Sequence, residues 1–134
     1  MASKTSDIEL KLASGRSVRA ALARPAAAKA PGLLLIHEWW GLNDEMRDVA
    51  ARMADAGFLA LSVDLFEGEV AHEPTRARAL MTGLDAAKAS ETMTGWAGWI
   101  RRNAACNGKV GALGFCMGGG WALNTALAAP LEAA

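Results

Sequence analysis

A cysteine set between glycines, directly after a short apolar run, constrains this sequence more than any other feature. Cys116 has Gly114 two residues before it and Gly118 two residues after it, and the run 110–113 is apolar. The pattern is typical of a nucleophile elbow, a sharp strand-to-helix turn that exposes the central side chain. Glycines are needed because a Cβ atom would collide where the two backbones approach each other. We therefore expect Cys116 to be a nucleophile at the N-terminus of a helix, whose dipole favours a thiolate.

The composition predicts an ordinary globular domain. The chain has 134 residues, of which 52% are hydrophobic, and its 14 acidic and 14 basic residues balance. A neutral chain gives no electrostatic reason to expect nucleic acid or an anionic membrane as partner. No apolar run approaches the roughly 18 residues of a membrane span. The two cysteines are too few and too unpatterned for a disulfide framework or a zinc site. We expect one domain over residues 1–134, no metal, and a cytoplasmic location.

Apolar runs and turn residues alternate as they do in an α/β fold. Two β-prone runs open the chain, and later short apolar runs are typical of strands buried on both faces. Helical periodicity separates these runs, and residues 67–75 look irregular. The expected strands are 8–12, 18–23, 33–36, 58–63 and 110–115, and a turn is expected at Asn107-Gly108. Helices are expected from 43 or 44 to 56 and over 118–129. Between them, one long helical region follows residue 75, with one face formed by Ala89, Met93, Trp96, Trp99 and Ile100. This order predicts an antiparallel hairpin followed by a mainly parallel sheet with helices on both faces.

A second cluster of chemically informative residues, His-Glu-Trp-Trp-Gly-Leu-Asn at 37–43, follows the expected strand 33–36. Loops at the carboxyl ends of parallel strands line the ligand crevice of such folds. The backbone N–H near Trp39, with that of Met117, is placed to form an oxyanion hole. Glu38, beside two tryptophans, would be partly desolvated, which suits proton transfer; a solvated loop acid is the alternative.

The other side chains of this loop have less specific interpretations. Trp39 and Trp40 are either core residues or walls of a pocket. His37 is better explained as a packed residue at the end of a strand than as a catalytic base. Cys116 itself could be a buried core cysteine, but its place between strand and helix favours the nucleophile. The sequence argues against a metal role, because no second cysteine or histidine lies at ligand spacing.

The motifs 37–43 and 114–119, with Asp64-Leu65-Phe66 between them, resemble the dienelactone hydrolase family. That family belongs to the α/β-hydrolases and uses a cysteine nucleophile. The resemblance covers nearly the whole chain and implies the N-terminal half of an α/β-hydrolase fold. It implies that Cys116 attacks a small lactone or ester, often carrying a carboxylate, and forms a thioester acyl-enzyme without a cofactor or metal.

The resemblance also assigns roles to individual residues. Trp39 and Met117 would supply the oxyanion-hole N–H groups, and Glu38 would accept the cysteine proton. Trp40 and Arg76 would bind substrate, the arginine by holding a substrate carboxylate. Arg78 is the alternative for that last role, and for either arginine a solvated helix charge explains the residue equally well.

The resemblance fails at the end of the sequence. An α/β-hydrolase triad runs in the order nucleophile, acid, histidine, but only Glu132 and no Asp or His follows Cys116. His37 and His72 both precede the nucleophile. We therefore expect residues 1–134 to be an incomplete, truncated hydrolase domain that lacks the C-terminal acid and histidine, with very weak turnover. Without a following strand, residues 110–115 would be an exposed apolar edge prone to self-association.

Two other classes of function remain open from the residues alone. Glutamine amidotransferase-like and flavodoxin-like enzymes also place a cysteine at a strand–helix turn, although they lack a loop like 37–43. The other hypothesis is a non-catalytic interaction fragment that binds a partner through its apolar edge.

Overall fold

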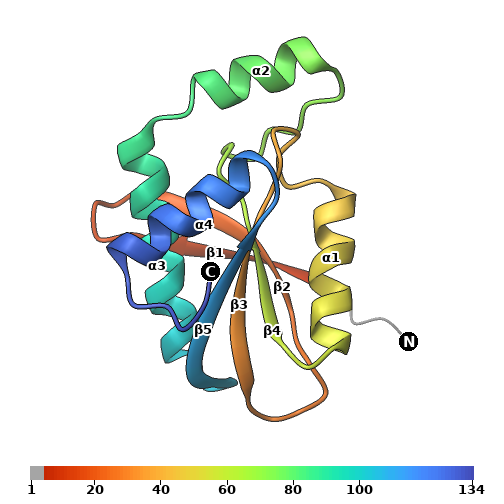
Figure 1. Cartoon of the computed structure of the whole chain (residues 1–134), viewed down its shortest axis with the longest axis vertical. Coiled ribbons are helices and arrows are strands. Elements are labelled where there is room, and N and C mark those ends of the chain that lie inside the picture. The colour runs from red at the N-terminus through yellow and green to blue at the C-terminus, as the bar shows by residue number, and fades with distance from the viewer. Residues whose placement is uncertain (1–4) are drawn as a thin grey trace.

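One five-stranded sheet with helices on both faces makes up the described chain, residues 5–134 of a computed structural model (Figure 1). Its elements in chain order are β1 (Thr5–Lys11), β2 (Ser17–Ala23), β3 (Ala30–Ile36), α1 (Asp44–Asp55), β4 (Leu59–Val63), α2 (Pro74–Thr82), α3 (Ala86–Arg102), β5 (Cys106–Gly114) and α4 (Met117–Ala128). Helix α1 covers one face of the sheet, and α3 and α4 cover the other.

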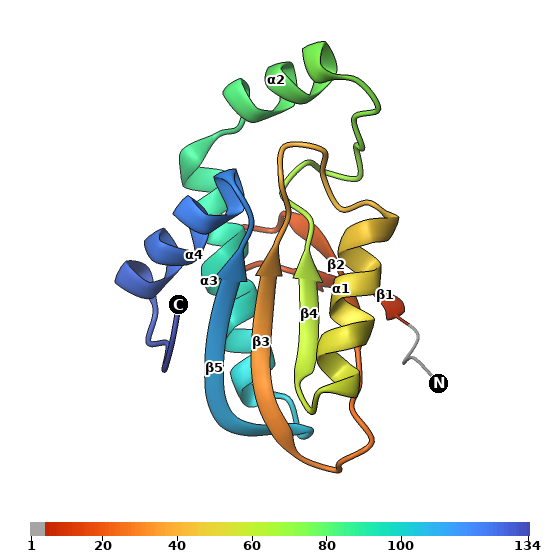
Figure 2. The same ribbon diagram turned by 45° about the vertical axis from the view of Figure 1, so that its right-hand side comes forward.

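The sheet has the strand order β1-β2-β4-β3-β5. Strand β2 is antiparallel to both β1 and β4, while β3 is parallel to β4 and β5. The predicted hairpin followed by a parallel sheet is therefore confirmed. The strands β3, β4 and β5 end on the side of the sheet where α2 lies (Figure 2). The loops that follow these strands are thus brought to one edge, which is where an α/β sheet forms its binding crevice.

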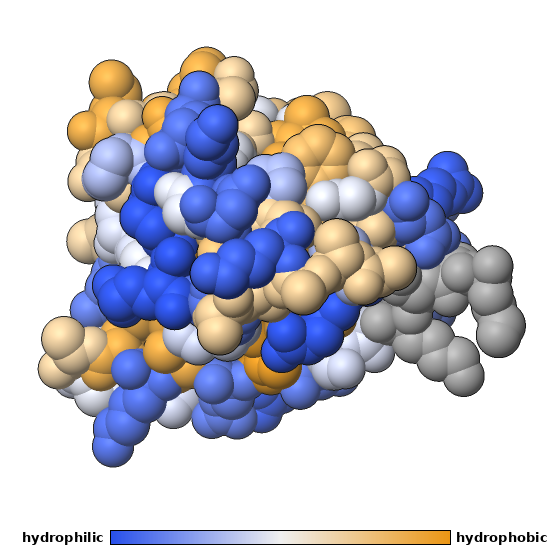
Figure 3. All heavy atoms as spheres, turned by 90° about the horizontal axis from the view of Figure 1, so that it is seen from below, coloured by the Kyte–Doolittle hydropathy of each residue, from blue (hydrophilic) through white to orange (hydrophobic). Residues whose placement is uncertain are grey.

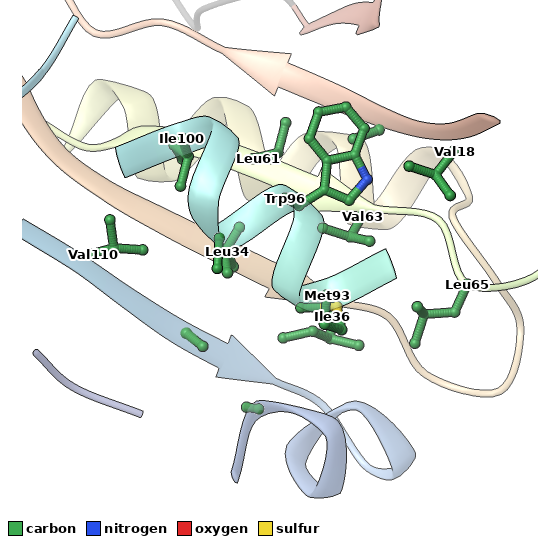
Figure 4. Close-up of a cluster of buried hydrophobic side chains, with 14 of the residues drawn as sticks. Val18, Leu34, Ile36, Leu61, Val63, Leu65, Met93, Trp96, Ile100 and Val110 are labelled. Carbon is green, nitrogen blue, oxygen red and sulfur yellow. The ribbon is translucent and has the colours of Figure 1, made fainter. Parts of the chain in front are cut away.

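The main core lies between the sheet and α3. The helical face predicted from periodicity is confirmed, since Met93, Trp96 and Ile100 are fully buried and Ala89 is nearly so. These side chains pack on the faces of β3, β4 and β5, against the residues Leu34, Ile36, Leu61, Val63 and Val110 (Figure 4). The opposite face carries a smaller cluster in which α1 packs on the sheet. Burial on both faces explains why β3 and β4 are continuous apolar runs.

Two predicted elements differ from the structure. The single long helical region is two helices, because α2 ends at Thr82 and α3 begins at Ala86, where the side chain of Asp85 accepts the Lys88 N–H at 3.0 Å. Strand β5 begins at Cys106, so Asn107-Gly108 lies within a strand rather than a turn. Gly108 has a φ of +91° where the β3–β5 register shifts. Asn-Gly supplies a positive φ to a β-bulge as readily as to a turn.

Strand β5 lies at the edge of the described sheet, as predicted, but its edge is partly covered. The Glu132 N–H donates to the Val110 carbonyl at 2.8 Å, and the Ala112 N–H donates to the Ala133 carbonyl at 3.0 Å. The Glu132 carboxylate accepts the Val110 N–H at 2.7 Å and both terminal nitrogens of Arg101 at 3.0 Å. Arg101 and then the Val110 N–H lower the pKa of Glu132 to about 2. The expectation of a wholly exposed edge over 110–115 is therefore corrected.

The face seen in Figure 3, viewed from below relative to Figure 1, mixes hydrophilic and hydrophobic side chains. Among residues 5–134, none of the helices combines the length and the apolar character needed to cross a membrane. Within the same residues, no group of three His, Cys, Asp or Glu side chains is arranged to hold a metal ion.

Candidate active site

The backbone presents Cys116 in the conformation of a nucleophile elbow. Cys116 stands between the end of β5 and the first residue of α4, with φ +54° and ψ −118°. A positive φ is uncommon for a residue that has a Cβ atom, and such strain gathers at functional sites. The cysteine is a free thiol and is exposed to solvent. A sharp turn that holds an exposed thiol at a helix N-terminus is the geometry expected of a nucleophile.

Two glycines of the motif are required by close backbone contacts. A Cβ atom on Gly114 would overlap the carbonyl group of Gly118. A Cβ atom on Gly118 would overlap the Ile36 carbonyl oxygen and lie 2.7 Å from that of His37. A Cβ atom on Gly120, in contrast, would meet nothing within 4 Å. The glycines at positions −2 and +2 from the cysteine therefore let the elbow close, as the sequence predicts.

The same contacts bring the loop after β3 to the elbow. Gly118 abuts the carbonyls of Ile36 and His37, and the Phe115 N–H donates to the Ile36 carbonyl at 3.2 Å. The next residue in the chain is Glu38, which is half-buried. Its carboxylate has no hydrogen-bond or ion-pair partner among residues 5–134. The structure thus places an unpaired carboxylate on the loop that packs beside Cys116.

His37 is a packed residue at the end of β3, as predicted. Its side chain is fully buried, and its ring lies 4.7 Å from that of Phe66. Nε2 accepts the Leu65 N–H at 3.0 Å, so the ring proton is on Nδ1 and is donated to the Glu38 carbonyl at 2.6 Å. Burial lowers the pKa of His37, so the ring stays neutral. With both nitrogens engaged, His37 positions the loop and is not free to act as a base.

This buried histidine predicts a loss of stability in mild acid. Because the folded-state pKa of His37 is below the ordinary 6.5, the unfolded chain binds the proton first. The contribution of neutral His37 to the free energy of unfolding should be fully present above pH 6.5. At lower pH the free energy of unfolding should decrease, by up to about 1.4 kcal/mol per pH unit. Urea unfolding from pH 8 to 5 measures this slope. His37→Gln should flatten it, while His72→Gln should leave it unchanged; an unchanged slope in His37→Gln would contradict the assignment.

The two proposed oxyanion-hole groups both have unoccupied N–H donors. Met117 is the first residue of α4, and the first N–H groups of a helix have no intrahelical acceptor. The Trp39 N–H has no acceptor within residues 5–134. It lies in a tight turn closed by the Gly41 N–H on the Glu38 carbonyl at 3.2 Å. Trp39 and Trp40 are half-buried with ring centroids 5.4 Å apart, which fits a wall better than a core.

The predicted substrate arginine is already paired. Arg76, on α2, donates from Nε and Nη2 to the two carboxylate oxygens of Glu69, each at 2.6 Å. Sequence reasoning missed Glu69 because a pair seven residues apart across an irregular segment follows no pattern. The alternative, Arg78, is exposed on the same helix.

A cavity of the described chain lies apart from the elbow, and Cys116 is not among its lining residues. It measures about 580 Å³ and is lined by residues of the β1–β2 hairpin, the 64–69 loop and the start of α3, among them Arg16, Asp64 and Lys88. Cys116 is instead open to solvent. His72 lines a separate hollow with Trp40 and Asn43, and Cys116 is not among the residues that line it.

The sequence was compared with models of known protein families. The sequence model of the dienelactone hydrolase family matches residues 18–134. The chain belongs to the dienelactone hydrolase family. This membership removes the support for the amidotransferase-like and flavodoxin-like alternatives.

Several family members are similar to the chain over part of their length. A putative carboxymethylenebutenolidase from Aquifex aeolicus is 32% identical over 123 residues, which are 87% of this chain and 53% of the relative. The carboxymethylenebutenolidase of Pseudomonas putida is 28% identical, over 91% of this chain and 56% of the relative. The solved structure m3DLH superimposes with a TM-score of 0.81 at 28% identity, covering 95% of this chain and 56% of that one. The predicted α/β-hydrolase fold class is confirmed, and the chain spans about half the length of the curated relatives it matches.

Proposed function

We propose that this chain carries the nucleophile of a hydrolase for small lactones or esters, in which Cys116 forms a thioester acyl-enzyme. The observation that carries the proposal is the exposed Cys116 at φ +54°, on an elbow that Gly114 and Gly118 allow to close against the loop after β3. The relatives named carboxymethylenebutenolidase support hydrolysis of a lactone.

In the proposed reaction, the Cys116 sulfur attacks the substrate carbonyl carbon. The N–H groups of Met117 and Trp39 stabilise the oxyanion of the tetrahedral intermediate. Glu38, whose carboxylate is unpaired, accepts the thiol proton and returns it to the leaving alkoxide. Trp40 forms part of the wall, and Arg76 holds a carboxylate borne by the substrate. The reaction to this point needs no cofactor or metal.

Hydrolysis of the acyl-enzyme is the step that these 134 residues support poorly. Water must be activated by a general base, but both nitrogens of His37 are engaged and His72 lines a hollow that does not include Cys116. We therefore propose that residues 1–134 are the nucleophile-bearing part of a larger catalytic domain. The acid and histidine of a complete site would come from residues outside this sequence. This is consistent with the match to the Aquifex aeolicus relative, which covers 53% of that protein's length.

The proposal predicts burst kinetics for the isolated 134-residue chain. With excess 4-nitrophenyl butyrate, absorbance should show release of about one equivalent of 4-nitrophenolate per chain, followed by a steady rate at least on the order of a hundredfold slower. The burst reports acylation and the slow phase reports deacylation. Fast steady hydrolysis that His72→Ala abolishes would contradict it, since His72 would then be the missing base.

We also propose that the chain self-associates through the edge of β5, and that Glu132 limits this association. Glu132→Gln should weaken the pair with Arg101 and expose more of the edge, so sedimentation velocity at pH 7 should show more dimer or larger species. Glu9→Gln, an equal charge change on the opposite edge strand, is the control. In the wild type, the ionised Glu132 carboxylate contributes fully to the stability of the fold above pH 4.5. This contribution is lost as the pH falls towards 2. Identical sedimentation of Glu132→Gln and wild type would contradict the role of Glu132.

Both cysteines are free, which supports a reducing compartment such as the cytoplasm.

A further inference from the structure

The guanidinium of Arg76 is occupied by a carboxylate in the geometry that a substrate carboxylate would use. Nε and Nη2 each donate to a different oxygen of Glu69, both at 2.6 Å. This bidentate arrangement is the one by which arginine recognises carboxylates in general. Arg76 and Glu69 are about half exposed, at 50% and 48%. An exposed pair of this kind contributes little net free energy, so another carboxylate can exchange with it.

The pair lies beside the loop of the proposed site. The Glu69 carbonyl oxygen is 2.6 Å from the position a Cβ atom on Gly41 would take, and the Ala71 N–H donates to the Trp40 carbonyl at 2.9 Å. The segment that carries Glu69 is therefore packed on the turn that contains Trp39. Helix α2, which carries Arg76, lies beyond the carboxyl ends of the strands (Figure 1).

The backbone at both ends of the pair is held by other bonds. The Glu69 N–H donates to the Phe66 carbonyl at 3.0 Å, so the loop does not depend on the carboxylate. The start of α2 is capped by Glu73, whose carboxylate accepts the Arg76 N–H at 2.7 Å. The side chains of Glu69 and Arg76 can thus separate while these backbone hydrogen bonds stay in place.

We propose that Glu69 determines specificity by occupying the carboxylate-binding fork of Arg76, so that an anionic substrate must displace it whereas a neutral one need not. This inference rests on the proposed acylation of Cys116. Removing the Glu69 charge should leave the guanidinium free and favour carboxylate-bearing esters over their neutral analogues.

The test compares two esters whose far ends are a carboxylate and the methyl ester of that carboxylate. Mono-4-nitrophenyl glutarate is anionic, and methyl 4-nitrophenyl glutarate is neutral; both release 4-nitrophenolate on acylation. Glu69→Gln should raise the anionic-to-neutral ratio of acylation rate constants by about threefold or more. Glu67→Gln, the same charge change two residues away, should leave the ratio near the wild-type value. Adding Arg76→Gln to Glu69→Gln should abolish the gain.

A second readout separates this inference from the proposed chemistry. The NMR signal of the Arg76 Nε–H, followed during a titration with glutarate, should shift at lower concentration in Glu69→Gln than in wild type, even if no ester acylates Cys116. Absence of a burst with every ester would overturn the proposed function only. Equal changes for both esters, an equal effect of Glu67→Gln, or an unchanged glutarate titration would overturn the role of Glu69.

Discussion

Replacing Cys116 by alanine is expected to abolish the burst of 4-nitrophenolate release from the 134-residue chain. The acyl-enzyme needs a sulfur at the elbow, and no neighbouring side chain offers a nucleophile in the same position. The rate constant for acylation should fall on the order of a thousandfold or more, to the background given by the oxyanion-hole groups. Stopped-flow absorbance with 4-nitrophenyl butyrate measures it, and circular dichroism should show an unchanged fold because Cys116 is exposed.

Two variants serve as controls for this result. Cys106→Ala removes the other thiol, which is buried at the start of β5, and should retain the burst. Cys116→Ser keeps a hydroxyl at the elbow but should behave like alanine, because serine needs a strong base that the chain does not place there. A burst that survives in Cys116→Ala would mean that another residue is acylated.

The largest effect on stability is expected from Gly118→Ala. The new methyl group would overlap the Ile36 carbonyl oxygen, so the turn or the end of β3 must move. We expect a loss of about 3 kcal/mol in the free energy of unfolding, or about 10 °C in Tm. Because the same shift displaces the loop that carries Glu38, acylation by any folded protein should also slow.

Gly120→Ala provides the matched control for this substitution. Gly120 lies two residues further along α4, where a Cβ atom would meet nothing within 4 Å. Alanine is favoured over glycine in a helix, so this variant should be about 0.5–1 kcal/mol more stable than wild type. Urea unfolding measures both variants. Similar effects of the two substitutions would show that the elbow does not close as described.

The elbow and the central sheet could be predicted from sequence because their determinants are local. Gly114 and Gly118 flank Cys116 within five residues, and the apolar run of β3 reports burial on both faces directly. The packed role of His37 also followed from its place at the end of that strand. In each case, one short segment contains the whole physical reason for its structure.

What the sequence did not predict depends on contacts between distant or weakly patterned residues. The bond between Glu132 and Val110 joins residues 22 positions apart, and it covers an edge that the apolar pattern alone would leave open. The break between α2 and α3 depends on Asp85 acting as a cap rather than continuing a helix. The pairing of Glu69 with Arg76 is set by the path of an irregular loop, which periodicity cannot describe.

The central claim is that Cys116 is the nucleophile, and the most direct measurement is the site of acylation. The chain would be mixed with 4-nitrophenyl butyrate, quenched in acid at the end of the burst and digested for peptide mass spectrometry. We predict one butyryl group on the peptide that contains Cys116 and an unmodified Cys106. A butyryl group on another side chain, or an unmodified Cys116 after a full burst, would contradict the account.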